Sequence, residues 1–355
     1  MPGHPSRGRS SRLGAAGDGD RRPAPDRRLV PLHDRGRRVS RPRWAVVVVN
    51  FRSSALLSEN FGFTADLPAD AVTVVVDNSA DEAELRTLHR VADRRGWTIV
   101  TSAGNPGFGA AVNLGAATAF SLGCEALLLV NPDVRLDAGT AQALVGTCLD
   151  DVGAMAAPLI RDSTGAVTFR GSEVSMRDGR IRGLGPVVIT ADGPAPGVAR
   201  LPAGSERWLT GACLAVHRDL FTRIGGFDPG YFMYWEDVDF SVRAARAGAT
   251  LALRLDLEVV HDEGGTQRRP RAGRGKSGLY YFYNARNRLR FAARLVPRGQ
   301  RRDWVLGTPA VSWEIYRRGG RRQLLQAPMS LVHLVRGAAT GLLALAPRRV
   351  GRRSA

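Results

Sequence analysis

Short runs of β-branched and aliphatic residues recur along the first half of this 355-residue chain, separated by segments of helix length. Continuous apolar runs, unlike alternating ones, are typical of parallel strands that are buried on both faces. The segments 81–96 and 107–123 between them have helical spacing. This alternation predicts a doubly wound, mostly parallel α/β sheet flanked by helices. The runs are WAVVVVN (44–50), VTVVVDN (72–78), WTIVTS (97–102) and ALLLVNPDV (126–134).

The net charge of +18 is distributed unevenly along the chain. Residues 1–43 carry 12 Arg against 4 Asp, net +8, and residues 268–355 carry 21 Lys and Arg against 2 acids, net +19. Residues 44–267 therefore carry −9. Basic segments outside an acidic middle indicate contact with an anionic surface, either nucleic acid or membrane headgroups. We expect a disordered Arg-rich arm (1–43), a folded domain (44–267) and a basic helical extension (268–355).

Other features restrict the class of protein. The three cysteines lie far apart with no paired spacing, which indicates neither a disulfide framework nor a zinc cluster and favours the reducing cytosol. No apolar core follows the early arginines, so we expect no signal peptide. The apolar segment 323–346 is interrupted by Pro328, His333 and Arg336 and falls short of the roughly 20 residues of a spanning helix. We expect it to be interfacial or packed.

Two glycine-containing stretches resemble nucleotide-binding loops without completing them. Pro270 stands where the phosphate loop around GRGKSG (273–278) needs a glycine, and Val112 replaces the third glycine of a dinucleotide fingerprint that begins at Gly107. The sequence therefore supports neither a nucleotide triphosphatase nor a Rossmann dehydrogenase. A sugar nucleotidyltransferase is also disfavoured, because no glycine-rich basic loop follows Asn50.

Polar side chains follow all four predicted strands of the first half. In open α/β sheets, ligands bind beyond the carboxyl ends of the strands. Asn and Asp are also frequent turn residues, so each of them taken singly has an equally good structural explanation. Their coincidence at one edge of the sheet favours a binding site. The residues are Asn50, Asp77, Asn78, Asn105, Asn131 and Asp133.

Two of the residues at strand ends have the chemistry of metal ligands. Asp133 could hold a hard divalent cation, which prefers oxygen ligands and can bridge diphosphate oxygens. His261 follows the apolar segment 251–261, and a neutral imidazole could complete a mixed site for a metal such as Mn²⁺. The alternatives are a turn-forming Asp and a structural His.

The stretch YFMYWEDVDFSVR (231–243) places three carboxylates among five aromatic side chains. Ionised carboxylates lose hydration in so apolar a setting unless a partner binds them. Helical spacing predicts a helix from Asp237 to Ala247, on which Asp239 and Arg243 form an i,i+4 ion pair at the surface.

Glu236 and Asp237 have no such partner nearby, and two interpretations stay open. Acids at a helix N-terminus are favoured by the helix dipole. Alternatively, one of the two carboxylates is a general base beside a pocket walled by aromatic side chains, including Tyr234 and Trp235. The residues alone rank Glu236 and Asp237 equally.

The ordered motifs of residues 44–265 resemble the family 2 glycosyltransferases of GT-A fold, particularly their bacterial rhamnosyltransferase-like branch. The segment YYFYNARNRLRF (280–291) is also similar to that branch. The resemblance implies a GT-A catalytic domain that inverts the anomeric centre without a covalent enzyme intermediate. The motifs are VVVVNFR, VVDNS, NPGFGAAVNLG, LLLVNPDV, LTGACLAVHRDLFTRIGGFDPGYFMYWEDVDFSVRAARAG and VVH.

The resemblance separates the candidate residues by role. Asp237 corresponds to the catalytic base of the family's ED motif, with Glu236 beside it as an orienting or acceptor-contacting neighbour. Asp133 corresponds to the last acid of the metal-binding DxD motif, and His261 to the histidine ligand of a divalent cation, Mg²⁺ or Mn²⁺. Asn131 stands in place of the first acid, a departure shared by this branch, and is therefore grouped with the donor-binding residues.

The resemblance also implies a nucleotide-sugar site. Asp77 corresponds to the acid that contacts the nucleotide base, and the other positions lie in the family's donor and acceptor loops. The expected acceptor pocket includes Tyr234 and Trp235. The expected nucleotide-sugar-binding residues are Asn50, Asp77, Asn105, Asn113, Asn131, Thr210 and Gly211.

The resemblance favours dTDP-L-rhamnose as the donor, although no residue distinguishes rhamnose from galactofuranose or N-acetylglucosamine. Aromatic residues interleave with arginine in 279–298, which is typical of a helix lying in a headgroup layer. We therefore expect a lipid-linked glycan acceptor and peripheral contact with the anionic inner face of the plasma membrane. A helix packed on the catalytic domain stays an alternative for 279–298. The alternative from another class is a non-enzymatic protein that binds nucleic acid through its Arg-rich tails. That interpretation leaves the acidic middle of the chain without a function.

Overall fold

The computed structural model describes residues 43–184, 203–262, 276–320 and 328–345, together with the backbone of 189–190 and 193–194. The expected disordered arm up to residue 42 lies outside the described residues. So do parts of the expected basic extension, including 268–275, 321–327 and 346–355.

The main sheet has the mostly parallel α/β character that the apolar runs predict. Its order is β3-β2-β1-β4-β13-β6-β14-β5, with β7 (Val167–Phe169) paired to β6. β1 runs parallel to β2 and β4, whereas β13 is antiparallel to both of its neighbours. The strands are β1 (Trp44–Asn50), β2 (Ala71–Asp77), β3 (Thr98–Thr101), β4 (Ala126–Val130), β5 (Val134–Arg135), β6 (Ala154–Arg161), β13 (Cys213–His217) and β14 (Thr250–His261).

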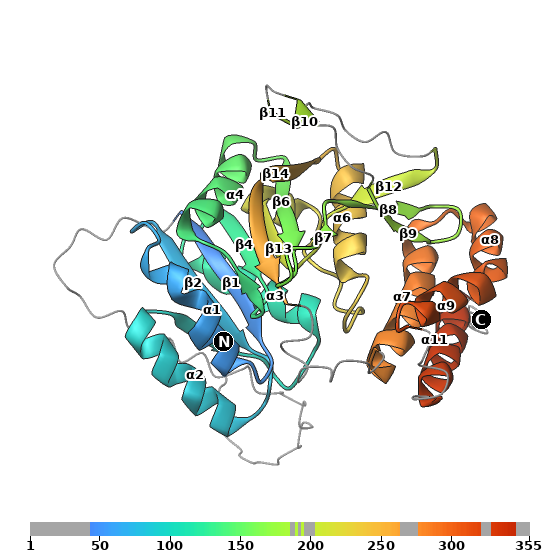
Figure 1. Cartoon of the computed structure of the whole chain (residues 1–355), viewed down its shortest axis with the longest axis horizontal. Coiled ribbons are helices and arrows are strands. Elements are labelled where there is room, and N and C mark those ends of the chain that lie inside the picture. Colours follow the sequence, from blue (N-terminus) through green and yellow to red (C-terminus); the bar gives the residue numbers. More distant parts are fainter. Residues whose placement is uncertain are drawn as a thin grey trace, which may run out of the picture. The chain divides into compact units, whose positions relative to one another are not determined.

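Alternate residues of β1 pack into two separate apolar cores, one on each face of the sheet. Val46 and Val48 contact the core that includes α1 (Ser54–Asn60), α2 (Glu82–Arg95) and α4 (Ala138–Asp150). Val47 and Val49 contact the core that includes α3 (Phe108–Ser121), α5 (Arg218–Arg223) and α6 (Glu236–Arg246). Helices therefore cover both faces, as a strand without polar alternation requires (Figure 1).

Smaller elements accompany the main sheet. A three-stranded sheet joins β12 (Ser205–Trp208), β8 (Ser172–Ser175) and β9 (Ile181–Gly183), and β12 leads directly into the predicted loop at Thr210. The short elements η1 (Phe61–Ala65), η2 (Arg298–Gln300), β10 (Ile189–Thr190) and β11 (Gly193–Pro194) are also described.

The C-terminal part is helical, with α7 (Gly278–Leu295), α8 (Arg301–Leu306), α9 (Thr308–Arg317) and α11 (Met329–Leu345) (Figure 1). Two glycines let α11 approach α7 closely. A Cβ at Gly337 would lie 2.2 Å from the carbonyl oxygen of Phe282, and one at Gly341 would lie 2.8 Å from the Cβ of Leu289. No helix among the described residues is long and apolar enough to cross a bilayer.

The prediction that 279–298 lies in a headgroup layer is wrong for α7. Its Arg288 is 2% exposed and donates to the Trp304 carbonyl oxygen at 3.0 Å and to the Thr308 hydroxyl at 3.1 Å. Burial lowers the pKa of Arg288 to about 10. The arginine can be buried because oxygen atoms of the protein accept from its guanidinium. α7 is therefore the packed helix of the alternative interpretation.

Candidate active site

Asp133 and His261 come from distant parts of the sequence and meet at one edge of the main sheet. β5 pairs antiparallel with β14, and the pairing of Val134 with His261 sets the imidazole beside Asp133. The Nε2 atom of His261 lies 3.1 Å from Oδ1 of Asp133, and Asp133 is 5% exposed. The structure thus brings together the two residues that the sequence predicts as metal ligands.

The chemistry of this pair fits a divalent cation that is shared with a substrate. A carboxylate oxygen and an imidazole nitrogen suit Mn²⁺, and Mg²⁺ usually takes one or two carboxylates plus substrate phosphates. Within the described part of the chain, no group of three or more His, Cys, Asp or Glu could hold a metal ion. The neighbouring Asp262 is paired with Arg135 at 3.0 Å. A cation here would therefore take its other ligands from diphosphate and water.

Asp77 lies at the end of β2 with one oxygen bound and one without a partner. Its Oδ1 accepts from Asn50 Nδ2 at 3.4 Å and from the Ser79 amide at 3.2 Å, whereas Oδ2 is buried and unpartnered. Asn50 also donates to Glu84 Oε1 at 3.1 Å, and Glu84 accepts from the Ser54 hydroxyl at 2.9 Å. Buried acceptors are normally hydrogen-bonded, so the free oxygen of Asp77 is available to a ligand donor. Glu84 was not predicted, because in the sequence it is one more acid in the first turn of α2.

The two predicted asparagines after β3 bind protein groups. Asn105 Oδ1 accepts from Asn78 Nδ2 at 2.8 Å and from the Gly107 amide at 3.1 Å. Asn113 donates to the Phe227 carbonyl oxygen at 2.7 Å and accepts from the Phe227 amide at 2.9 Å. Asn105 thus fixes the loop before α3, and Asn113 holds α3 to the loop after α5. Contact of either side chain with a nucleotide sugar stays a prediction.

A series of hydrogen bonds joins the loop after β12 to Asn131. The Gly211 amide donates to Asp237 Oδ2 at 3.2 Å, and the Ala212 amide contacts the Thr210 hydroxyl at 3.3 Å. The Asn131 amide then donates to the Ala212 carbonyl oxygen at 2.8 Å. The side-chain oxygen of Asn131 is buried without a partner. This series of contacts places the acids of α6 near the end of β4, where Asp133 lies.

Glu236 and Asp237 open α6 immediately after a turn with two left-handed residues. Glu236 is 8% exposed, and its Oε2 is buried without a partner. Burial, and then the adjacent Asp237, raise the pKa of Glu236. Burial also raises the pKa of Asp237, but hydrogen bonds from the Gly211 and Val238 amides offset part of that rise. Asp237 is therefore the more readily ionised of the two.

Two predictions for this segment are corrected by the burial of its side chains. Trp235 is 4% exposed and packs in a core with Phe291, 5.5 Å between ring centroids, so it does not line an open acceptor pocket. Asp239 is fully buried, so its pair with Arg243, 2.6 Å from Nε to Oδ2, is not at the surface. Tyr234 is partly exposed, and its place in an acceptor pocket stays a prediction.

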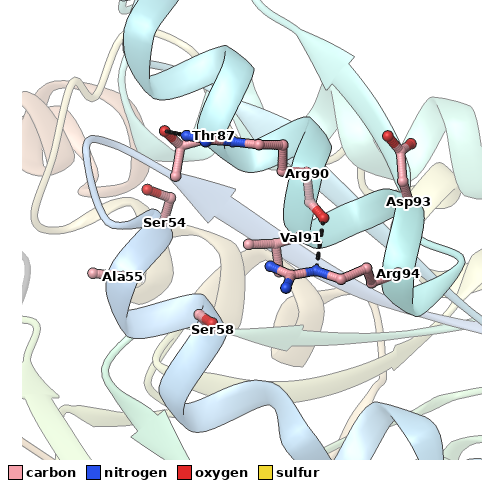
Figure 2. Close-up of a pocket in the computed structure, with 8 residues that line it drawn as sticks. All are labelled: Ser54, Ala55, Ser58, Thr87, Arg90, Val91, Asp93 and Arg94. Carbon is pink, nitrogen blue, oxygen red and sulfur yellow. Dashed lines mark hydrogen bonds between the residues drawn. The ribbon is translucent and has the colours of Figure 1, made fainter.

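A cavity of about 680 Å³ lies between α1 and α2 (Figure 2). Arg90 donates to the Thr87 hydroxyl at 3.0 Å, and Arg94 donates to the Arg90 carbonyl oxygen at 3.0 Å. The guanidinium groups of Arg90 and Arg94 thus bind acceptors of α2 itself. No predicted site residue lines the cavity. The lining residues are Ser54, Ala55, Ser58, Thr87, Arg90, Val91, Asp93 and Arg94.

Comparison with known proteins finds similar chains, although no family model matches. The chain is 32% identical over 206 residues to an N-acetylglucosaminyl-diphospho-decaprenol L-rhamnosyltransferase of Mycobacterium tuberculosis, covering 54% of this chain and 66% of the relative. It is 46% identical over 54 residues to the rhamnosyltransferase WbbL of Escherichia coli, covering 15% of this chain and 20% of the relative. The chain thus spans just under two thirds of the length of the first relative.

A solved structure shows the same fold. The mannosyltransferase PcManGT of Pyrobaculum calidifontis, in complex with GDP-Man and Mn²⁺, superimposes with a TM-score of 0.51 at 16% identity, covering 85% of this chain and 88% of that one. The predicted fold class is confirmed. The similarity to rhamnosyltransferase-like family 2 glycosyltransferases is confirmed as well, and it favours glycosyl transfer over the nucleic-acid-binding alternative.

Proposed function

We propose that the chain is an inverting glycosyltransferase that moves a sugar from a nucleotide donor to a hydroxyl group of a glycan acceptor. One observation carries the proposal most directly. The series of contacts through Gly211, Ala212 and Asn131 links the carboxylate of Asp237 to the strand end that carries the Asp133 and His261 pair. A base and a diphosphate-binding pair at one edge of a sheet are the two parts that glycosyl transfer needs.

The residues of the chain divide the chemistry between them. Asp237 removes the proton of the acceptor hydroxyl, and attack on the face opposite the leaving diphosphate inverts the anomeric centre. Glu236 is kept protonated by burial and by the charge of Asp237, so it can donate a hydrogen bond to the acceptor. The free oxygen of Asp77 accepts from the nucleotide base. When bound by Asp133 and His261, a divalent cation would stabilise the charge on the departing diphosphate.

The donor that we propose is dTDP-L-rhamnose. The M. tuberculosis and E. coli relatives are both rhamnosyltransferases, and the similarity of this chain to each of them supports the same sugar here. The test is a panel of dTDP-rhamnose, UDP-galactofuranose and UDP-N-acetylglucosamine, each measured for binding and slow hydrolysis with Mn²⁺ and with chelator. Metal-dependent binding confined to dTDP-rhamnose is expected. Equal binding of all donors would contradict the donor assignment, and binding of none would contradict the proposed activity.

The proposed acceptor is a lipid-linked glycan at the inner face of the plasma membrane. The M. tuberculosis relative is named as an enzyme that acts on N-acetylglucosaminyl-diphospho-decaprenol, a lipid-linked sugar. In this chain, α11 supports contact with a lipid surface, because Arg336 is its one Arg, Lys, Asp or Glu and its outer face is apolar. Trp313 of the neighbouring α9 is 50% exposed, and tryptophan is enriched where proteins meet the interface. The exposed large apolar side chains of α11 are Met329, Leu331, Val332, Val335, Leu342 and Leu343.

A further inference from the structure

Asn287 of α7 contacts the turn that precedes the acids of α6. Its side chain is fully buried, and Nδ2 donates to the carbonyl oxygens of Met233 and Tyr234, each at 2.9 Å. Its Oδ1 accepts from Arg286 Nη1 at 2.9 Å. Both donor hydrogens of this amide are therefore used on consecutive carbonyl groups, 53 and 54 positions earlier in the chain.

The turn needs such contacts because its backbone is strained. Tyr234 and Trp235 have φ values of 64° and 74°, in the left-handed region that residues other than glycine rarely adopt. Conformations of this kind persist only where the surrounding structure fixes them. Because α6 begins at Glu236, the carbonyl groups of the turn before Trp235 take donors from other elements. The amide of Phe108 at the start of α3 donates to the Phe232 carbonyl oxygen at 2.9 Å. Asn287 donates to the carbonyl oxygens of the next two residues.

Arginines of α7 bind two acids that lie on either side of the strained turn, Asp228 before it and Asp239 after it. Arg290 lies 2.9 Å from Oδ2 of Asp228, and Arg294 lies 3.0 Å from the same oxygen. Arg294 also lies 3.5 Å from Oδ1 of the buried Asp239. Gly230 leaves the space that Arg290 occupies, since a Cβ there would lie 1.8 Å from Nη2. α7 thus contacts the segment before, at and after the strained turn.

We propose that Asn287 is a positioning residue for glycosyl transfer. By holding the carbonyls of Met233 and Tyr234 it fixes the start of α6, and so the direction in which Asp237 presents its carboxylate. The inference rests on the proposed function of Asp237 as the base. It makes α7 a part of the catalytic framework and not only a helix attached to it.

The test compares Asn287 with Asn284, a matched position one turn earlier in α7. Asn284 is 8% exposed, and its Nδ2 donates to the Tyr280 carbonyl oxygen of its own helix at 2.9 Å. Asn287→Leu removes both donors to the turn. Asn287→Asp keeps the shape and leaves at most one donor, the O–H of a protonated carboxyl group. Asn284→Leu removes a buried amide that has no contact with the turn. Hydrogen exchange of residues 232–238 and kinetics with the donor are measured for each chain.

Both Asn287 variants should exchange faster than wild type in 232–238, because the strained turn is no longer held. Their kcat should fall by about 10- to 100-fold, with little change in the KM of the donor. The acid limb of the kcat profile should move to lower pH, since a loosened turn admits water to Asp237. Asn284→Leu should show none of these changes.

Several outcomes would overturn the proposal. These are unchanged exchange in 232–238, a loss of kcat equal to that of Asn284→Leu, a parallel rise in KM, or failure of both Asn287 variants to fold. Hydrogen exchange needs no substrate, so failure of this inference appears in the variants. Failure of the proposed function appears in the wild-type chain, as absence of transfer from any donor.

Discussion

The carboxylate of Asp239 binds the guanidinium of Arg243 across 2.6 Å, and the Asp239 side chain is fully buried. Its other oxygen accepts from the Tyr231 hydroxyl at 3.3 Å. Arg243 also donates to the Gly226 carbonyl oxygen at 2.8 Å. The third acid of the EDVD sequence therefore holds α6 to the preceding loop, whereas Oε2 of Glu236 is buried without a partner and Asp237 accepts from two backbone amides.

Asp239→Ala should destabilise the fold strongly. The change leaves Arg243 without its carboxylate in a buried setting, and breaking one partner of such a pair typically costs about 3–5 kcal/mol. The free energy of unfolding in urea measures the effect. The control is Arg86→Ala, which removes an exposed i,i+4 partner of Glu82 and should change stability by an amount too small to measure. Similar stability changes in the two variants would contradict a structural role for Asp239.

Asp237→Asn should abolish most of the transfer while the donor still binds. A general base contributes about 10²- to 10⁴-fold to the rate, and the amide cannot take the proton. Turnover and donor affinity are measured separately, the latter by calorimetry. Asp219→Asn, at an acid whose side chain is 64% exposed in the first turn of α5, is the matched control. An equal loss of affinity and turnover in Asp237→Asn would argue for a binding role instead.

The strands, and the position of Asp133 and His261 at strand ends, could be predicted from sequence because they depend on local patterns. β1 spans residues 44–50, the same residues as the apolar run in the sequence. β14 ends at His261, as the apolar segment 251–261 predicts. A parallel strand that is buried on both faces needs apolar residues at nearly every position. Each such strand can therefore be recognised in the sequence without knowing which strands lie beside it. The position of His261 then follows from the end of its strand.

The packing around α6 could not be predicted, because it depends on residues far away in the chain. Asp239 is separated from Arg294 by the whole of β14 and most of α7, and only their contact shows that Asp239 is buried. Trp235 has the composition of a pocket wall, yet Phe291 covers it. The role of Asn287 is equally invisible in sequence, since nothing in an asparagine within a helix indicates which carbonyl groups it will bind.

Glu236→Gln should stabilise the fold, and increasingly so as the pH rises. The raised pKa of Glu236 means that the folded state holds a proton which the unfolded state releases. The stability from this proton is fully present below the ordinary pKa of glutamate and is lost as the pH rises through the raised value. Glutamine never ionises and avoids the loss. Thermal unfolding of both chains from about pH 5 to about pH 8 should show a growing difference in Tm. A constant difference would mean that Glu236 is ionised throughout.

Asp133→Ala should weaken binding of a nucleoside diphosphate in Mn²⁺ by at least about tenfold, because it removes the oxygen that lies beside His261. Calorimetry with Mn²⁺ and with chelator separates the metal-dependent part of the affinity, which should vanish in the variant. Asp262→Asn is the control, since this adjacent acid is 37% exposed at its side chain and pairs with Arg135. Wild-type binding that is the same with chelator would remove the basis for a cation at this site.

Val335→Asp should detach the chain from anionic vesicles. Val335 is 58% exposed on the outer face of α11, so a carboxylate there leaves the fold intact but opposes insertion into a negatively charged headgroup layer. Loss of one buried valine side chain alone weakens partition by about tenfold. Flotation with vesicles of phosphatidylglycerol, compared with neutral phosphatidylcholine, measures binding, and Tm confirms folding.

Val152→Asp is the control for this change, because Val152 is 52% exposed in the loop between α4 and β6, outside the C-terminal helices. It adds the same charge and removes the same side chain, so any effect of net charge alone is common to the two variants. If α11 is the surface that meets lipid, only Val335→Asp loses binding to the anionic vesicles. Equal binding by both variants would place the membrane contact elsewhere in the chain. Equal loss of binding would show that the net charge of the protein determines binding, and that the apolar face of α11 does not.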